Sequence, residues 1–186
     1  MFPIGHASIS YLISQIGRKP KHFGWKDVIF IIFCGNIFDF DFFLPPISGF
    51  PNGGHHYFPT HTPLAGIILF LILFLLFRKV FSKHTFVLAG LAMLSHLVLD
   101  DLSYWLYLLG LAKEGSPQIF WLYPFDPRRK IEIQNFFESY SEEPIGNEYF
   151  VKRYFLGAPQ LFVSEFLMMI IAVLVLARKV VRGKKR

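Results

Sequence analysis

Leu64–Phe77 has the sequence LAGIILFLILFLLF, an almost purely aliphatic and aromatic run. No Asp, Glu, Lys or Arg occurs between Asp41 and Arg78, so the flanking uncharged residues can extend this run to the ~20 residues that cross a bilayer. A second run, Leu161–Ala177, contains a single charge, Glu165. The chain is 53% hydrophobic and has a mean hydropathy of +0.43. Together these features predict a protein built from membrane helices.

The chain of 186 residues is long enough for one domain, and we expect five helices within it. The predicted helices span residues 3–16, 27–44, 63–80, 85–109 and 159–181. Pro45 and Pro46 cannot continue a helix, whereas Pro63 suits a first turn. The expected fold class is therefore all-α, a polytopic membrane helix bundle formed by a single domain over residues 1–186. A four-span alternative stays open, because the ~14 residues of the first helix cover only ~21 Å and could lie on the surface.

Positive charges cluster in the segments 17–26, 78–84 and 178–186. Short basic loops beside apolar helices mark the cytoplasmic side of a membrane. All three fall on that side if the N-terminus is outside and the C-terminus is cytoplasmic, with the segment 110–157 on the outer side. We therefore expect a multi-pass protein of the cell (inner) membrane whose partner is the lipid bilayer. The net charge of +6 is explained by these loops and does not indicate a nucleic-acid partner.

Three stretches place His and Asp inside or beside the apolar runs. They are Asp39-Phe40-Asp41, the loop with His55, His56 and His61, and the helix segment with His96 and Asp100. A charged side chain at the centre of a membrane helix costs roughly 2.5–3.5 kcal/mol, so such residues are candidates for function. Imidazole nitrogen and carboxylate oxygen are both zinc ligands, whereas the single cysteine, Cys34, excludes a Cys-based site. The stretches therefore predict a membrane-embedded metal site.

Spacing defines how these residues could act. His96 and Asp100 are four residues apart and share one helix face, so they could bind one ion, or the Asp could orient the His. A buried hydrogen bond that pins two helices explains the pair equally well. Asp101 is rotated roughly 100° around the helix axis from Asp100 and therefore lies on a different face. Asp39 and Asp41 face the same way only if the segment is unwound, and a polar helix end is the alternative.

The predicted topology brings the outer loop and the N-terminus to the same side. The loop residues His55, His56 and His61 lead directly into the helix at 63–80, although a His-rich loop can also be merely solvated. His6, near the start of the first helix, falls on the same side, and this position makes it a candidate ligand.

Taken together, these donors suffice for two metal ions. The candidate ligands are His6, Asp39, Asp41, His56, His61, His96 and Asp100, with His55 in reserve. We expect divalent ions, first of all Zn²⁺, with Mn²⁺ or Mg²⁺ as alternatives. Paired ions can clamp a phosphoryl group and activate water, and one of Asp39, Asp41 and Asp100 could act as the catalytic base. Arg128 and Arg129 could bind an anionic substrate, although a solvated basic loop is the simpler interpretation.

The pattern resembles the YdjM-like family of membrane-bound metal-dependent hydrolases. Four motifs within residues 5–130 carry the resemblance: Gly5-His6, Asp39-Phe40-Asp41, His56-Tyr57-Phe58-Pro59-Thr60-His61 and Ser95-His96 with Asp100. They are similar to the family's N-terminal His, its Pro-Asp-Ile-Asp helix end, its His-Arg-Gly-x-Thr-His-Ser signature and its Ser-His-x-x-x-Asp helix. The chain departs from the family where Tyr57-Phe58 replaces Arg-Gly. The resemblance implies a helical membrane protein and hydrolysis that depends on a divalent metal, without naming a substrate.

Three functions remain to be compared. The first is an integral-membrane metal-dependent hydrolase acting on a phosphoester of a lipid or of a lipid-linked anionic molecule. The second is a metal-ion or proton transporter or binding protein, which needs ionisable groups along both halves of a path. The inner halves of the predicted helices 63–80 and 85–109 carry no acid, which disfavours it. The third is a structural membrane protein in which His96 contributes only to stability.

Overall fold

The computed structural model describes residues 3–43, 60–111, 119, 121–122, 125 and 159–183, which form helices and contain no strand. In chain order the helices are α1 (Pro3–Ile13), α2 (Trp25–Asn36), the 3₁₀ helix η1 (Ile37–Phe43), α4 (Pro63–Phe77), α5 (Lys83–Asp100), α6 (Leu102–Leu108) and α9 (Pro159–Gly183). The all-α prediction is therefore confirmed for the described part of the chain.

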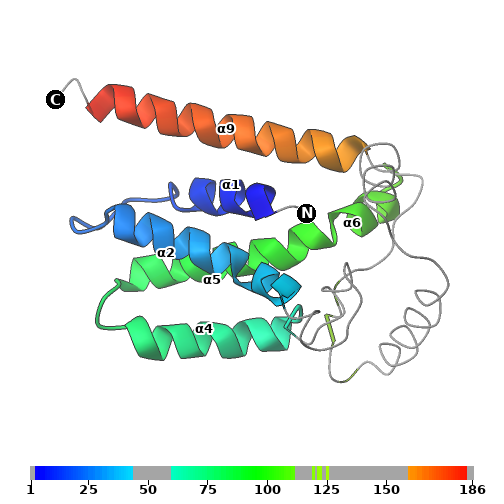
Figure 1. Cartoon of the computed structure of the whole chain (residues 1–186), viewed down its shortest axis with the longest axis horizontal. Helices are drawn as coiled ribbons and strands as arrows, with labels where there is room; N and C mark the ends of the chain where they lie inside the picture. The colour runs from blue at the N-terminus through cyan, green and yellow to red at the C-terminus, as the bar shows by residue number, and fades with distance from the viewer. Residues whose placement is uncertain are drawn as a thin grey trace.

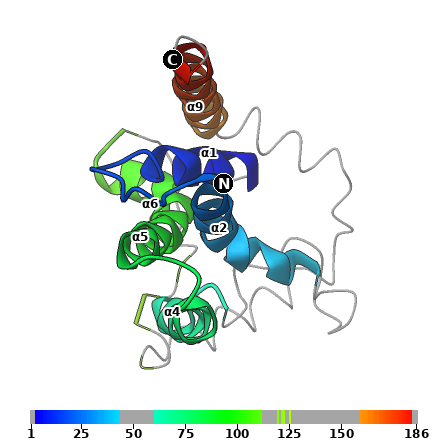
Figure 2. The same cartoon turned by 90° about the vertical axis from the view of Figure 1, so that its left-hand side faces the viewer.

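Helices α1, α2 and α5 form the centre of the bundle, and α4 and α9 lie on opposite sides of it (Figure 1 and Figure 2). α2 packs along α5, α1 contacts both of them, α9 contacts α1, and α4 contacts α5. The core around α2 and α5 is apolar: Ile31, Cys34, Phe38, Ala89 and Ala92 are each at most 1% exposed. The short α1 is therefore a central element of the bundle and not a helix that lies on its surface.

Two of the predicted helices are interrupted. The helix expected over residues 85–109 is divided at Asp101 into α5 and α6, and the helix expected over 27–44 continues past Asn36 only as the tighter η1. At the division, the Asp101 carboxylate accepts hydrogen bonds from the Ile119 backbone N–H at 2.9 Å and from the Trp121 Nε1–H at 2.6 Å. These bonds hold the chain that follows α6 against the end of α5.

The sequence predicts helices that cross a bilayer, but within the described residues no helix combines the length and the apolar character that a crossing requires. Large apolar side chains are exposed along both outer helices. On α4, Ile67 is 58% and Leu76 is 68% exposed, and on α9 Val163 is 53% and Leu174 is 62% exposed. Contiguous apolar faces of this kind mark surfaces that contact lipid or another protein.

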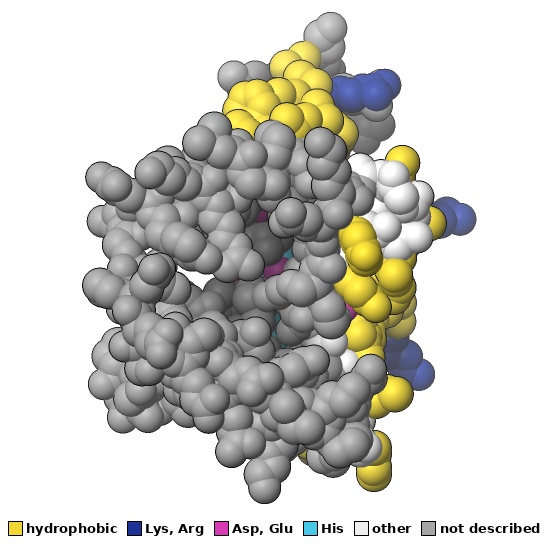
Figure 3. Space-filling view, turned by 90° about the vertical axis from the view of Figure 1, so that its right-hand side faces the viewer, with side chains coloured by type: hydrophobic (Ala, Val, Ile, Leu, Met, Phe, Trp, Pro, Cys, Tyr) yellow, Lys and Arg dark blue, Asp and Glu magenta, His cyan; other side chains and the backbone are white. Residues whose placement is uncertain are grey.

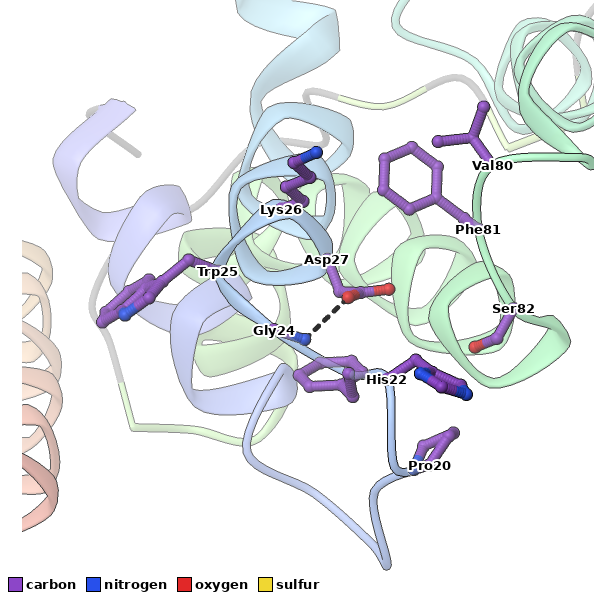
Figure 4. A pocket seen from close by; sticks show the side chains of 10 residues that line it. Pro20, His22, Gly24, Trp25, Lys26, Asp27, Val80, Phe81 and Ser82 are labelled. Carbon is purple, nitrogen blue, oxygen red and sulfur yellow. Dashed lines mark hydrogen bonds between the residues drawn. The ribbon is translucent and has the colours of Figure 1, made fainter. Parts of the chain in front are cut away.

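Asp27 ties α2 to α5 at the end of the bundle remote from the N-terminus. Its Oδ1 accepts a hydrogen bond from the Thr85 hydroxyl at 2.6 Å, and its Oδ2 accepts one from the Gly24 N–H at 2.8 Å (Figure 4). The same carboxylate lines a cavity of about 370 Å³ together with His22 and Ser82. Because both of its oxygens are engaged, this buried acid acts as a helix cap and an interhelical contact.

Gly35 sets the distance between the three central helices. A Cβ atom at this position would overlap the Ser10 side chain of α1 and lie 3.3 Å from the Ala92 Cβ of α5. The Ser10 hydroxyl is itself satisfied within α1, because it donates to the His6 carbonyl at 2.7 Å. The missing side chain of Gly35 therefore allows α1 and α5 to pack directly against the α2 backbone.

Replacing Gly35 by alanine should lower the stability of the bundle. Overpacking a tight contact costs about 1–3 kcal/mol, which exceeds the gain of about 1 kcal/mol from better helix propensity. Thermal unfolding of purified Gly35→Ala in detergent should show a reduced Tm. Gly24→Ala measures a glycine-to-alanine change without crowding, at the N-cap of α2, because nothing lies within 4 Å of a Cβ at that position. A Tm of Gly35→Ala equal to that of the wild type would contradict the close approach at Gly35.

Candidate metal centre

Five predicted ligands converge at the end of the bundle where α1 begins. They are His6 from α1, Asp39 from η1, His61 from the turn before α4, and His96 and Asp100 from α5. The three imidazoles are each at most 1% exposed, and Asp100 is 5% exposed. Figure 3 looks onto this end of the molecule and shows acidic and histidine side chains recessed at its centre. Segments far apart in the sequence therefore build one buried polar cluster.

Local structure explains how each side chain reaches the cluster. His96 and Asp100 lie one turn apart on α5, as their spacing of four residues requires. His61 is held directly before the start of α4, where the Thr62 side chain accepts a hydrogen bond from the Ala65 N–H at 3.3 Å. Pro63 occupies the first helical position, which suits its fixed φ. A capped helix start therefore fixes the direction from which His61 enters the site.

Asp100 is surrounded by the three imidazoles. Its Oδ1 lies 3.0 Å from His6 Nε2, and its Oδ2 lies 3.1 Å from His96 Nε2 and 3.8 Å from His61 Nε2. The same nitrogen, His96 Nε2, also lies 3.7 Å from Asp39 Oδ1. Two groups of three donors, His6/His96/Asp100 and Asp39/His61/His96, each have ligand atoms within 4.8 Å of one another. Either spacing is compatible with a single bound cation.

The orientation of His96 is set by the backbone of α2. His96 Nδ1 lies 2.8 Å from the Gly35 carbonyl oxygen, which can only accept a hydrogen bond. Nδ1 therefore carries the hydrogen, and in the neutral ring the lone pair on Nε2 points toward Asp39 and Asp100. A carboxylate and a lone pair 3.1 Å apart repel each other unless a cation or a proton lies between them. This arrangement fits a metal ion, because a ligating His usually donates its other N–H in this way.

A second observation argues against two protonated imidazoles side by side in the cluster. The His6 and His96 rings are stacked, with centroids 3.8 Å apart and an interplanar angle of 23°. Two imidazolium cations at this distance in a buried site would repel each other strongly. Protonation of both rings is thus a poor way to balance the carboxylates, whereas one divalent cation would balance them with both rings neutral.

His96 limits how many ions the described donors can hold. It belongs to both groups of donors, and with Nδ1 engaged it has one lone pair to offer, on Nε2. The two donor groups therefore share one nitrogen, so an ion bound by one group would take His96 from the other. A second ion, as the sequence predicts, would need further donors, for which Asp41 and His56 remain candidates.

The outcome differs among the predicted residues. Five of the seven predicted ligands are brought together in the cluster. Asp41 lies in η1, where a 3₁₀ helix of three residues per turn places it about 120° around the axis from Asp39, and its side chain is not among those described. His55, His56, Arg128 and Arg129 lie outside the described residues, so their roles stay predictions.

Two contacts at the site were not part of the sequence prediction. The Gly35 carbonyl is a backbone group, and no side-chain pattern indicates it. Asp101 was predicted only to point away from Asp100, and its bonds to Ile119 and Trp121 join distant segments. The sequence indicates the role of Asp101 only indirectly: two adjacent acids end an apolar run, and only one of them can face the cluster.

A model of the YdjM inner membrane protein family matches residues 1–184, and the chain therefore belongs to this family. The match covers all the described helices and agrees with the resemblance seen in the sequence. No curated protein and no solved structure matches the chain significantly. The family description indicates a location in the inner membrane.

Replacing Asp100 by asparagine should remove most of the metal that copurifies with the protein. The change deletes the charge at the centre of three imidazoles while keeping the size of the side chain. Asp101→Asn is the matched control, because it alters the neighbouring carboxylate, which bonds to Trp121 at 2.6 Å. The number of metal ions per protein molecule, measured by elemental mass spectrometry, should fall in Asp100→Asn only. The control should change tryptophan fluorescence instead, and equal metal loss in both variants would contradict the assignment.

Proposed function

We propose that this member of the YdjM inner membrane protein family is an integral-membrane metal-dependent hydrolase that acts on a phosphoester of a lipid or lipid-linked molecule. The observation that carries the proposal is the buried convergence of three imidazoles and two carboxylates, in which His96 Nε2 faces both acids. A buried His–Asp pair that only pinned two helices would not require donors from four separate segments.

The membrane setting rests on the family and on the surface of the bundle. α4 and α9 expose apolar faces on opposite sides, which suits contact with lipid on both. The basic segments 17–26, 78–84 and 178–186 favour a multi-pass arrangement with the C-terminus in the cytoplasm and the N-terminus outside. In that orientation the buried metal centre lies toward the outer side.

The donor set favours zinc. Three neutral imidazoles with carboxylate oxygens are a common zinc environment, and Mn²⁺ or Mg²⁺ would prefer more oxygen ligands. A bound divalent ion would supply a Lewis acid for a phosphoryl oxygen and would activate water. With Asp39 left free to act as a base, the protein side chains would hold the ion through His6, His96 and Asp100, one of the two donor groups.

Asp39 is the best-placed general base among the described acids. Its side chain is 13% exposed, whereas that of Asp100 is fully buried among the imidazoles. Asp39 Oδ2 has no hydrogen-bond partner in the described part of the structure. This oxygen is buried at the site and could accept a proton from an attacking water there, while Asp100 remains a ligand. Asp41 is the alternative base.

The transport alternative is less well supported. Asp27 is a buried acid at the other end of the bundle, but its oxygens are engaged by Thr85 and Gly24. Between Asp27 and the metal centre, the described core contains apolar residues such as Ile31 and Cys34. The described residues therefore do not line a continuous polar path from one end to the other.

Chelation should abolish phosphoester hydrolysis by the purified protein, and Zn²⁺ should restore it. The assay would present a panel of phosphoesters, including long-chain phosphatidic acid and a water-soluble aryl phosphate, to protein in detergent with measured metal content. Asp39→Asn should lower kcat by about 10²–10⁴-fold, the usual contribution of a general base, while the protein still binds metal. A protein that binds metal but shows no chelator-sensitive hydrolysis, and that carries the ion into vesicles, would contradict the proposal and favour transport.

A further inference from the structure

An apolar groove runs between α4 and α5 beside the metal centre. Its volume is about 310 Å³, within the range of about 300–1,000 Å³ that is typical of ligand sites. It is lined by Phe38, Pro63, Gly66, Ile67, Phe70 and Leu71 on one side and by Gly90, Met93, Leu94 and Leu97 on the other. None of these side chains is polar. The groove therefore suits a hydrocarbon ligand.

Two glycines position the aromatic walls of the groove. A Cβ atom at Gly66 would lie 3.1 Å from the Phe38 ring, and one at Gly90 would lie 3.3 Å from the Phe70 ring. Both distances are too short for ordinary contacts, so larger residues would push the aromatic walls or fill the space. The glycines thus let the Phe38 and Phe70 rings pack close to the helix backbones, which fixes the position of two walls of the groove.

Phe38 is the wall that the groove shares with the metal centre. Its ring centroid lies 5.1 Å from that of His96 and 5.8 Å from that of His61. Pro63 lines the same end of the groove and follows His61 by two residues. From Pro63 the lining continues along α4 to Leu71, which at 1.5 Å per residue is about 12 Å. The groove therefore begins at the metal centre and extends along the bundle.

The groove is also open to the surface. Ile67, Leu71 and Leu94 are 58%, 51% and 50% exposed, and they continue the apolar face of α4. In a bilayer, a hydrocarbon chain could enter the groove laterally between α4 and α5 without leaving an apolar environment. A polar or charged occupant would find no partner along the described lining.

We propose that this groove holds one acyl chain of a phospholipid substrate whose phosphate lies at the metal centre. The inference rests on the proposed function and adds to it the substrate class, a lipid with at least one long acyl chain. A divalent ion held at the centre would interact with the phosphate oxygens, and the adjoining groove would receive the hydrocarbon. This continuity distinguishes the groove from the other apolar surfaces of the bundle.

Leu94→Trp tests the proposal, because the larger side chain should fill the groove. Leu91→Trp is the matched control, since Leu91 lies on the same helix, is 44% exposed and does not line the groove. The probe is phosphatidic acid with a photoactivatable diazirine on one acyl chain, and the labelled peptides are mapped by mass spectrometry. We expect labelling within 63–71 and 90–97 in the wild type and in the control, and a loss of about tenfold in Leu94→Trp, equivalent to about 1.4 kcal/mol.

Hydrolysis provides a second measurement. The value of kcat/KM for long-chain phosphatidic acid should fall about tenfold in Leu94→Trp, whereas hydrolysis of the water-soluble aryl phosphate and the metal content should match the control. Equal labelling in both variants would overturn the groove proposal and indicate bulk lipid only. Absence of bound metal from the wild type would overturn the proposed function, whatever the labelling pattern, so that the two failures are distinguishable.

Discussion

The hydrogen bond between His96 Nδ1 and the Gly35 carbonyl is the contact on which the arrangement of the bundle and its site depends. It joins α5 to α2 at the position where α1 also packs against Gly35. Because the carbonyl can only accept, the bond selects the ring nitrogen that faces Asp39 and Asp100. A shift of α2 relative to α5 would therefore rotate the imidazole out of the site. Helix packing and the geometry of the candidate metal centre are linked through this one backbone group.

The buried acids at the two ends of the bundle, Asp27 and Asp100, have different kinds of partner. Asp27 accepts hydrogen bonds from a hydroxyl and a backbone N–H, which are fixed neutral donors. Such donors satisfy a carboxylate permanently and leave no reason for a ligand. Asp100 lies among imidazoles, whose nitrogens can bind a proton or a metal ion. The first arrangement therefore serves the fold, and the second has the chemistry of a functional site.

Much of this organisation was predictable from the sequence, for identifiable reasons. Long apolar runs and prolines indicated the helices, and the charge distribution placed His6 and His61 on the same side. The pairing of His96 with Asp100 follows from helical spacing alone. The division at Asp101 was not predictable, because it depends on hydrogen bonds to Ile119 and Trp121, and a single sequence carries no signal for such distant partners. The sharing of His96 between two donor groups likewise requires the three-dimensional arrangement.

Phe38 connects the three features that the proposed activity would require. Its side chain is 1% exposed, belongs to the apolar core, contacts the imidazoles and forms one wall of the groove. In the proposed arrangement, burial of an acyl chain would contribute about 0.8 kcal/mol per methylene group, far from the reacting bond. Binding energy from such a remote part of a substrate can be used to position the phosphoester at the metal centre. The aromatic ring separates the hydrocarbon from the ligands, so the apolar groove need not weaken the polar site beside it.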